Sequence, residues 1–210
     1  MTFLALLLAA LVAAALTPVS ANVTSRPVFG WPLIGIPLSI GLAGLLAFAI
    51  NHVTTMTFVA VLAVSSVSAI LATQLVVDLF VRRLLRELSY GGLVVFLLAI
   101  AGVEPGSASG FKGAIVGAIA MTVITALLVG LSRGALGLGD LHLSPLLGAL
   151  IGWFSPSAVL LAWMVTAFSA ALFTVGGLAT KRVSRGAMIP YGPFMILGSC
   201  AALLASVAGS

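Results

Sequence analysis

The sequence contains very little charge. Of its 210 residues, nine are Lys or Arg and four are Asp or Glu, so charged residues make up only 6% of the chain. Soluble domains carry roughly 25% charged residues, because their surface has to face water. With 62% hydrophobic residues and a mean hydropathy of +1.33, the composition excludes a soluble globular domain.

Cysteine and histidine are also scarce. The one cysteine, Cys200, lies within an apolar run, which excludes both a disulfide framework and a C-x-x-C metal or redox motif. The two histidines, His52 and His142, are far apart in the sequence, and the topology below puts them on opposite sides of a membrane. The sequence therefore offers no set of zinc ligands, and we expect neither a metal nor another cofactor.

Long apolar runs recur from one end of the chain to the other. They lie near residues 2–17, 32–50, 55–80, 90–103, 112–131, 142–155, 157–179 and 187–207. A bilayer offers no water to backbone amides, so such runs must form helices. Several are shorter than the ~20 residues that cross the hydrocarbon core, but a short run can span where neighbouring helices bury it. We predict an all-α, polytopic membrane bundle of about eight transmembrane helices.

No repeat or charged block divides the chain. We expect one membrane-embedded domain over residues 1–210, with two N-terminal spans in residues 1–54 and a six-span core in residues 55–207. The first run also resembles a secretory signal peptide, with V-S-A as a cleavage site, but it has no basic n-region. We therefore expect residues 1–21 to be retained as part of the first span.

The basic residues predict the orientation of these helices. If the segment after residue 80 is cytoplasmic, eight of the nine basic residues fall on the cytoplasmic side and Lys112 alone falls outside. Positive residues are retained on the cytoplasmic side, so we expect both termini outside. The net charge of +5 then reflects topology. Because the basic residues are dispersed without interleaved aromatics, we expect no nucleic acid partner.

Only two aspartates occur in the chain, Asp78 and Asp140. Asp78 closes the third apolar run and Asp140 precedes the sixth, so both are expected at the cytoplasmic edge of the membrane. One interpretation is structural: Asp78 pairs with a neighbouring arginine, and Asp140 favours a helix N-terminus. The other is functional, because a carboxylate at membrane depth is costly and is a functional candidate by default.

Two carboxylates at the same depth could perform acid–base chemistry. Both cannot ionise easily when they are close, so one holds a proton while the other is charged. The charged group can take a proton from water that attacks a peptide carbonyl, while the protonated group donates to the oxyanion. Gly137 and Gly139, just before Asp140, would let the backbone turn tightly and let another chain segment approach.

Three motifs resemble those of the type IV prepilin peptidases, a family of bacterial intramembrane aspartic proteases. GLGDLHL, at residues 137–143, is similar to the family's second catalytic motif, G-x-G-D-x-K-L. VVDLFVRRLLRELS resembles the first, in which an aspartate closes a span before a basic loop. IPYGPFMILG, at residues 189–198, is similar to the I-P-[FY]-G-P-[FA] segment that opens the family's last span. The resemblance covers roughly residues 30–207.

The resemblance implies a leader peptidase, an aspartic endopeptidase of the bacterial cytoplasmic (plasma) membrane. Its partners would be a type IV pilin-like precursor, cut after a glycine at the cytoplasmic face, and the lipid bilayer. The resemblance implies Asp78 and Asp140 as catalytic residues. It implies as further motif residues Gly137, Gly139, His142, Pro190, Gly192 and Pro193. The interval LTPVSANVTSRPVFG lacks the paired C-x-x-C motifs of two-function members, so no N-methylation activity is expected.

The chain departs from the family pattern in three places. Leu84, Leu85 and Arg86 stand where the family usually has Leu-Pro or Ile-Pro followed by Asn or Asp. His142 replaces a lysine, which would make a positive charge there depend on pH. Acidic residues often found early in the second span are absent from WPLIGIPLSIG. These departures concern substrate choice and loop shape more than the chemistry, because both aspartates and both motif glycines are present.

Some residues and the function itself have more than one interpretation. Tyr191 fits either stacking on a substrate or anchoring at the interface, and Glu87 fits either contact with a basic leader or an i,i+4 pair with Arg83. Presenilin-like proteases share G-x-G-D but carry a P-A-L motif that this chain lacks. A non-enzymatic transporter or pilus or secretion assembly factor is the alternative function, although it would need mid-span charges that are lacking.

Overall fold

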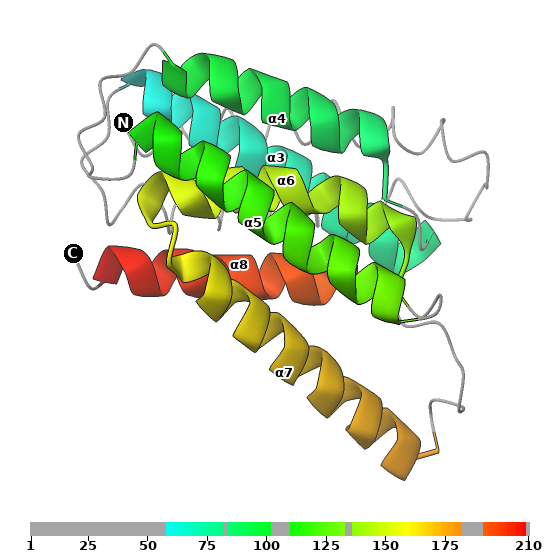
Figure 1. Ribbon diagram of the computed structural model, residues 1–210. Coiled ribbons are helices and arrows are strands. Elements are labelled where there is room, and N and C mark those ends of the chain that lie inside the picture. Colours follow the sequence, from blue (N-terminus) through cyan, green and yellow to red (C-terminus); the bar gives the residue numbers. More distant parts are fainter. Residues whose placement is uncertain (1–57, 82–83, 102–109, 133–135, 182–190, 209–210) are drawn as a thin grey trace.

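The computed structural model describes residues 58–81, 84–101, 110–132, 136–181 and 191–208 (Figure 1). All regular structure within these ranges is helical, as the composition predicts. The helices are α3 (Phe58–Val81), α4 (Arg86–Ala101), α5 (Gly110–Leu131), α6 (Leu138–Phe154), α7 (Ala158–Ala179) and α8 (Gly192–Ala208). They correspond to the last six predicted runs. The two spans expected within residues 1–54 lie outside the described residues.

Three of the described helices are long and apolar enough to cross a membrane. They contain the segments Val59–Leu79, Gly110–Leu131 and Ala158–Ala179. The helices α6 and α8 are apolar but shorter, with 17 residues each, and α4 has 16. The structure therefore supports an all-α membrane bundle, and by length and composition it provides three of the eight expected spans within its described part.

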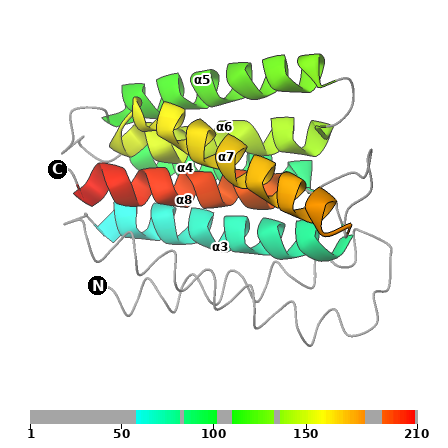
Figure 2. The same cartoon turned by 90° about the horizontal axis from the view of Figure 1, so that it is seen from below.

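Helix α6 packs against most of the other described helices. It contacts α4, α5, α7 and α8, while α3 packs against α4 and α8 (Figures 1 and 2). Its first residues therefore lie among several neighbours, even though the helix is short. Ten of its residues are buried, from Asp140 to Gly152. This burial explains how a 17-residue helix can lie within a bilayer, because protein rather than lipid surrounds it.

Glycines bring α5 and α6 into backbone contact. A β-carbon built on Gly148 would overlap the carbonyl oxygen of Gly117, and one built on Gly152 would overlap that of Gly113. Small residues of this kind let two membrane helices approach closely, where packing replaces the hydrophobic effect as the source of association. The α5–α6 contact therefore determines where α6 lies.

The helices α5 and α7 expose most of their surface, whereas α3 buries most of its own. Large apolar side chains of α5 and α7 are exposed, among them Ile119, Leu127, Met164, Phe168 and Leu172, as expected of a surface that faces lipid. Most of α3 is buried, although it carries polar side chains. The Ser68 and Thr73 hydroxyls donate to the carbonyl oxygens of Val64 and Ala69 one turn earlier. These bonds satisfy the hydroxyl groups within the helix itself.

Six helix ends lie on the same side of the bundle. The C-terminal ends of α3, α5 and α7 and the N-terminal ends of α4, α6 and α8 are on the right in Figure 1, where the end of α7 lies apart from the others. We call this the junction end. Of the three basic residues that the structure describes, Arg86 and Lys181 flank helices at this end, whereas Lys112 lies in the first turn of α5 at the other.

Candidate active site

Asp78 lies in the last turn of α3, at the junction end. Only 5% of its surface is exposed, so its carboxylate is held away from bulk water. A β-carbon built on Gly192 would be 2.8 Å from Asp78 Oδ2 and 3.4 Å from Asp78 Cγ. Gly192 is the first residue of α8, and a helix N-terminus carries a partial positive charge. The carboxylate of Asp78 therefore lies against the first turn of α8.

Asp140 lies in the first turn of α6, and 5% of its surface is exposed. Its Oδ2 accepts a hydrogen bond of 3.1 Å from the backbone N–H of Gly137, the N-cap residue. This is one half of a capping box; the other half cannot form because glycine has no side chain to accept the bond from N3. One oxygen of Asp140 therefore has the structural role that the sequence suggests, because it stabilises the N-terminus of α6.

A proline shapes the turn of α6 that follows Asp140. Pro145 has no N–H to donate to the carbonyl of Leu141. The Ser144 hydroxyl donates to that carbonyl instead, over 2.8 Å. The helix therefore continues through the proline with the Leu141 carbonyl paired, and the first turn keeps its position.

The structure brings the two aspartates together. They come from different helices, 62 positions apart in the sequence, yet the carboxylates are close enough to interact electrostatically. Tyr191, half-buried just before α8, is also within electrostatic range of Asp140. The ring of Tyr191 lies 6.1 Å from that of Trp163 and 6.4 Å from that of Phe194, measured between centroids. Tyr191 thus packs against two aromatic rings of the bundle and lies within electrostatic range of Asp140.

One motif residue of α8 lies next to an aspartate. Gly192 contacts Asp78 as described, and Pro193 follows it in the first turn of α8, where proline needs no hydrogen-bond partner. Pro190 lies outside the described residues. The first turn of α8 is formed through the carbonyl of Tyr191, which accepts bonds from the N–H groups of Phe194 and Met195.

The two motif glycines have different structural roles. A β-carbon on Gly139 would be 3.1 Å from Leu84 Cβ, so this glycine allows the close approach of another segment, as predicted. Gly137 has extended backbone angles, with φ of −82° and ψ of 151°, which other residues adopt readily. Its β-carbon would meet Asp140 Oδ2 at 3.5 Å, an ordinary contact. The expectation that Gly137 is needed for a tight turn is therefore wrong for the local geometry.

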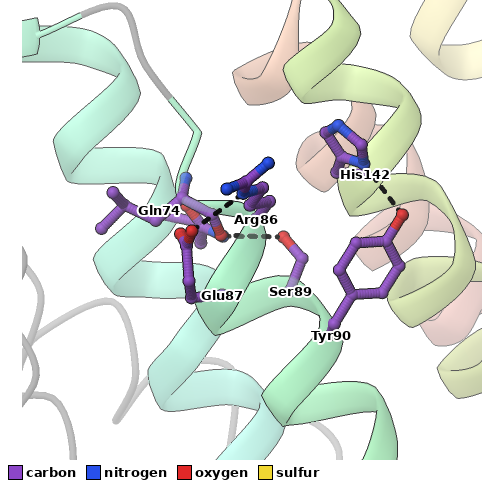
Figure 3. A network of polar contacts seen from close by, with 7 residues as sticks. Gln74, Arg86, Glu87, Ser89, Tyr90 and His142 are labelled. Atoms are coloured by element: carbon purple, nitrogen blue, oxygen red, sulfur yellow. Dashed lines mark hydrogen bonds and ion pairs between the residues drawn. The ribbon is translucent and has the colours of Figure 1, made fainter.

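His142 takes part in a different contact. Its Nδ1 lies 2.8 Å from the Tyr90 hydroxyl on α4, and the two rings meet edge to face (Figure 3). Residues two apart on a helix do not share a face, so His142 and Asp140 lie on different sides of α6. Glu87 of α4 is within electrostatic range of His142. Where the family has lysine, this chain therefore has a histidine on α6 that contacts α4.

Glu87 makes an ion pair within α4. Its Oε1 lies 2.9 Å from Arg86 Nε, and both side chains are exposed (Figure 3). The predicted partner, Arg83, lies outside the described residues. Exposed pairs of this kind contribute little to stability because water and salt screen them, so the Arg86–Glu87 pair is a surface feature of the junction end.

Leu84 is a site residue that the sequence pattern did not single out. Its Cδ1 would be 3.6 Å from a β-carbon on Gly139 and 3.2 Å from one on Gly192. It therefore lies between the segment that carries Asp140 and the start of α8 that touches Asp78. In an apolar chain, the sequence does not distinguish a leucine that packs between two such segments from any other leucine. Its position six residues after Asp78, in the segment that departs from the family pattern, was the one available indication.

Two buried carboxylates beside helix N-termini can exchange protons with a bound reactant. One accepts a proton while the other donates, as acid–base catalysis requires. Within the described part of the chain, no group of three or more His, Cys, Asp or Glu residues could hold a metal ion.

Comparison with known proteins identifies the family. The sequence profile of the type IV leader peptidase family matches residues 65–207, well over half of the chain. The match includes α4 to α8 and most of α3, with both aspartates. No curated protein and no solved structure gives a significant match. This membrane protein therefore belongs to the type IV leader peptidase family, a family of proteases.

Proposed function

We propose that this protein is an aspartic endopeptidase that removes the leader from type IV pilin-like precursors, without the N-methylation activity. The observation that carries the proposal is that Asp78 and Asp140, both 5% exposed, lie within electrostatic range of each other at one end of a helical bundle. Membership of a leader peptidase family supports the substrate class. The absence of cysteine between the first two apolar runs supports peptidase activity alone.

In the proposed reaction the two carboxylates act as acid and base. The ionised group accepts a proton from water as the water oxygen bonds to the carbon of the peptide carbonyl. The protonated group donates its proton to the carbonyl oxygen, so no free oxyanion forms. When the tetrahedral adduct breaks its C–N bond, the group that took a proton from water gives it to the leaving amine. The other group takes a proton back from a hydroxyl of the adduct, so a carboxyl product forms and the pair returns to its starting state. The reaction consumes one water and needs no other reactant.

We place the site at the cytoplasmic face of the bacterial plasma membrane, in a bundle of about eight spans. Eight of the nine basic residues fall on the side of the two aspartates in this topology, in accord with the retention of positive residues in the cytoplasm. Arg86 and Lys181 support this orientation, because both lie at the junction end. A pilin precursor, whose hydrophobic helix lies in the bilayer, would present its leader at the same depth.

Reconstitution tests the proposed function. The purified protein is placed in liposomes with a pilin-like precursor from the same cell, and the precursor is followed by gel mobility and by mass spectrometry of its new N-terminus. We expect a shortened product that begins immediately after a glycine. An intact precursor, with the protein folded and inserted, would instead favour the non-enzymatic alternative.

Gly192→Ala is expected to reduce cleavage about tenfold to hundredfold. The added methyl group would lie 2.8 Å from Asp78 Oδ2, so the carboxylate has to move away from the start of α8. A displacement of about 1 Å at a reacting group is enough for a loss of this size. The measurement is the initial rate of precursor cleavage per folded protein. Gly176→Ala on α7 is the matched control, because nothing lies within 4 Å of its β-carbon position; equal losses in both variants would contradict the role of Gly192.

A further inference from the structure

A buried glutamine lies one turn before Asp78. Gln74 is 0% exposed on α3, four residues from Asp78 and therefore on the same face of the helix. Burial of an amide costs free energy unless its groups are hydrogen-bonded. The side chain of Gln74 makes three such bonds, and none of them is to its own helix.

All three bonds hold the start of α4. Gln74 Oε1 accepts from the backbone N–H of Leu85 at 2.9 Å, and Gln74 Nε2 donates to the carbonyl oxygen of Leu85 at 2.8 Å. Nε2 also lies 2.8 Å from Ser89 Oγ, one turn further along α4 (Figure 3). A single side chain thus binds both the N–H and the C=O of Leu85, the residue before α4 begins. We call this arrangement the Gln74 clamp.

The clamp determines where Leu84 lies. Leu84 directly precedes the clamped residue, and its side chain is the one that packs between Gly139 and Gly192. Leu84 Cδ1 and Asp78 Oδ2 both lie within 3.2 Å of the same point, the β-carbon position of Gly192. A shift of the segment at Leu84 would therefore be transmitted to both Asp78 and the turn before Asp140.

We propose that Gln74 is a positioning residue of the peptidase site: through Leu85 it holds Leu84 between Gly139 and Gly192, next to the segments that carry the two aspartates. The inference rests on the proposed function, and it assigns no contact between Gln74 and the substrate. It also accounts for a departure from the family pattern. Where the family usually has proline, this chain has Leu85, whose N–H needs an acceptor, and Gln74 Oε1 supplies it. A proline would restrict the backbone of the preceding residue directly; here the clamp does so.

Gln74→Met tests the clamp, because methionine has a similar length and high helix propensity but cannot make the three bonds. We expect kcat per folded protein to fall about tenfold to hundredfold, with a smaller change in KM. Amide hydrogen exchange of the segment 84–89, followed by mass spectrometry, should become faster. The control is Thr73→Val, which removes a buried hydroxyl bonded only to the Ala69 carbonyl of the same helix. A wild-type kcat for Gln74→Met, or an equal fall for Thr73→Val, would overturn the proposal.

Leu85→Pro supplies a rescue that a purely structural role would not produce. Added to Gln74→Met, it removes the orphaned N–H and restricts Leu84, so kcat should recover toward the wild-type value. No recovery of kcat would overturn the assignment.

Ser89→Ala gives a second variant, which leaves Gln74 in place and removes one of its three bonds. We expect kcat to fall less than it does in Gln74→Met. An equal or larger fall would count against the clamp. The exchange measurement does not depend on cleavage, so failure of the proposed function and failure of the clamp are distinguishable.

Discussion

Asp78→Asn and Asp140→Asn are each expected to abolish precursor cleavage, with a loss of at least about 10³-fold. General acid–base catalysis contributes about 10²–10⁴-fold, and an amide can neither accept nor donate the proton that the reaction moves. Asparagine has nearly the shape of aspartate, so the packing against Gly192 and Gly137 is retained. The measurement is the rate of precursor cleavage by protein reconstituted in liposomes.

A measurement of stability distinguishes a variant that has lost the reaction from one that has lost its fold. Each asparagine variant replaces one member of a buried carboxyl pair, whose two members cannot both ionise without repulsion. We therefore expect the thermal unfolding midpoint of each variant in detergent to be equal to or higher than that of the wild type. Glu87→Gln is the matched control, because it removes an exposed carboxylate at the same end of the bundle. Cleavage at near the wild-type rate by either asparagine variant would disprove the proposal that Asp78 and Asp140 act together in the reaction.

Of the variants considered, Gly148→Ala is expected to have the largest effect on stability, a loss of about 3 kcal/mol in the free energy of unfolding. Its new β-carbon would overlap the Gly117 carbonyl and lie 2.5 Å from Met121 Cβ, so the backbones of α5 and α6 have to separate. Because α6 carries Asp140 and packs against α8, the separation should also reduce cleavage. The measurement is the unfolding midpoint in a denaturing detergent titration.

Gly130→Ala on α5 is the control for this substitution. Nothing lies within 4 Å of its β-carbon position, and alanine is favoured over glycine in a helix by about 0.5–1 kcal/mol. The same chemical change should therefore stabilise the protein at position 130 and destabilise it at position 148. A Gly148→Ala protein as stable as the Gly130→Ala protein would show that α5 and α6 do not make backbone contact.

The helices themselves could be predicted closely from the apolar runs. The run at 157–179 corresponds to α7 at Ala158–Ala179, and that at 112–131 corresponds to α5 at Gly110–Leu131. The starts of α6 and α4 were predicted four residues late, at 142 and 90 instead of Leu138 and Arg86. The physical reason is that hydrophobicity marks the residues that avoid water, while a helix can extend beyond them through a polar first turn.

The two aspartates could also be identified from the sequence alone. They are the only ones in the chain, they fall at the same expected depth, and ionisable groups near lipid are rare because they are costly. The family resemblance implies His142 as a further motif residue, and the structure shows that it contacts Tyr90 on α4. Residues two apart on a helix point to different sides, so the position of His142 next to Asp140 in the sequence did not predict this contact.

The sequence by itself determined that the chain is a helical membrane protein, which residues are the candidates for its chemistry, and which family it resembles. The reason is that apolar runs and rare carboxylates can be recognised from composition and short motifs alone. Only the tertiary structure decided that Leu84 fills the space between Gly139 and Gly192, and that the Gln74 amide holds the segment that carries it. A neutral leucine and a neutral glutamine have no distinctive spacing. Their roles arise from the rotation and close approach of α3, α6 and α8, which are set by contacts between residues far apart in the chain.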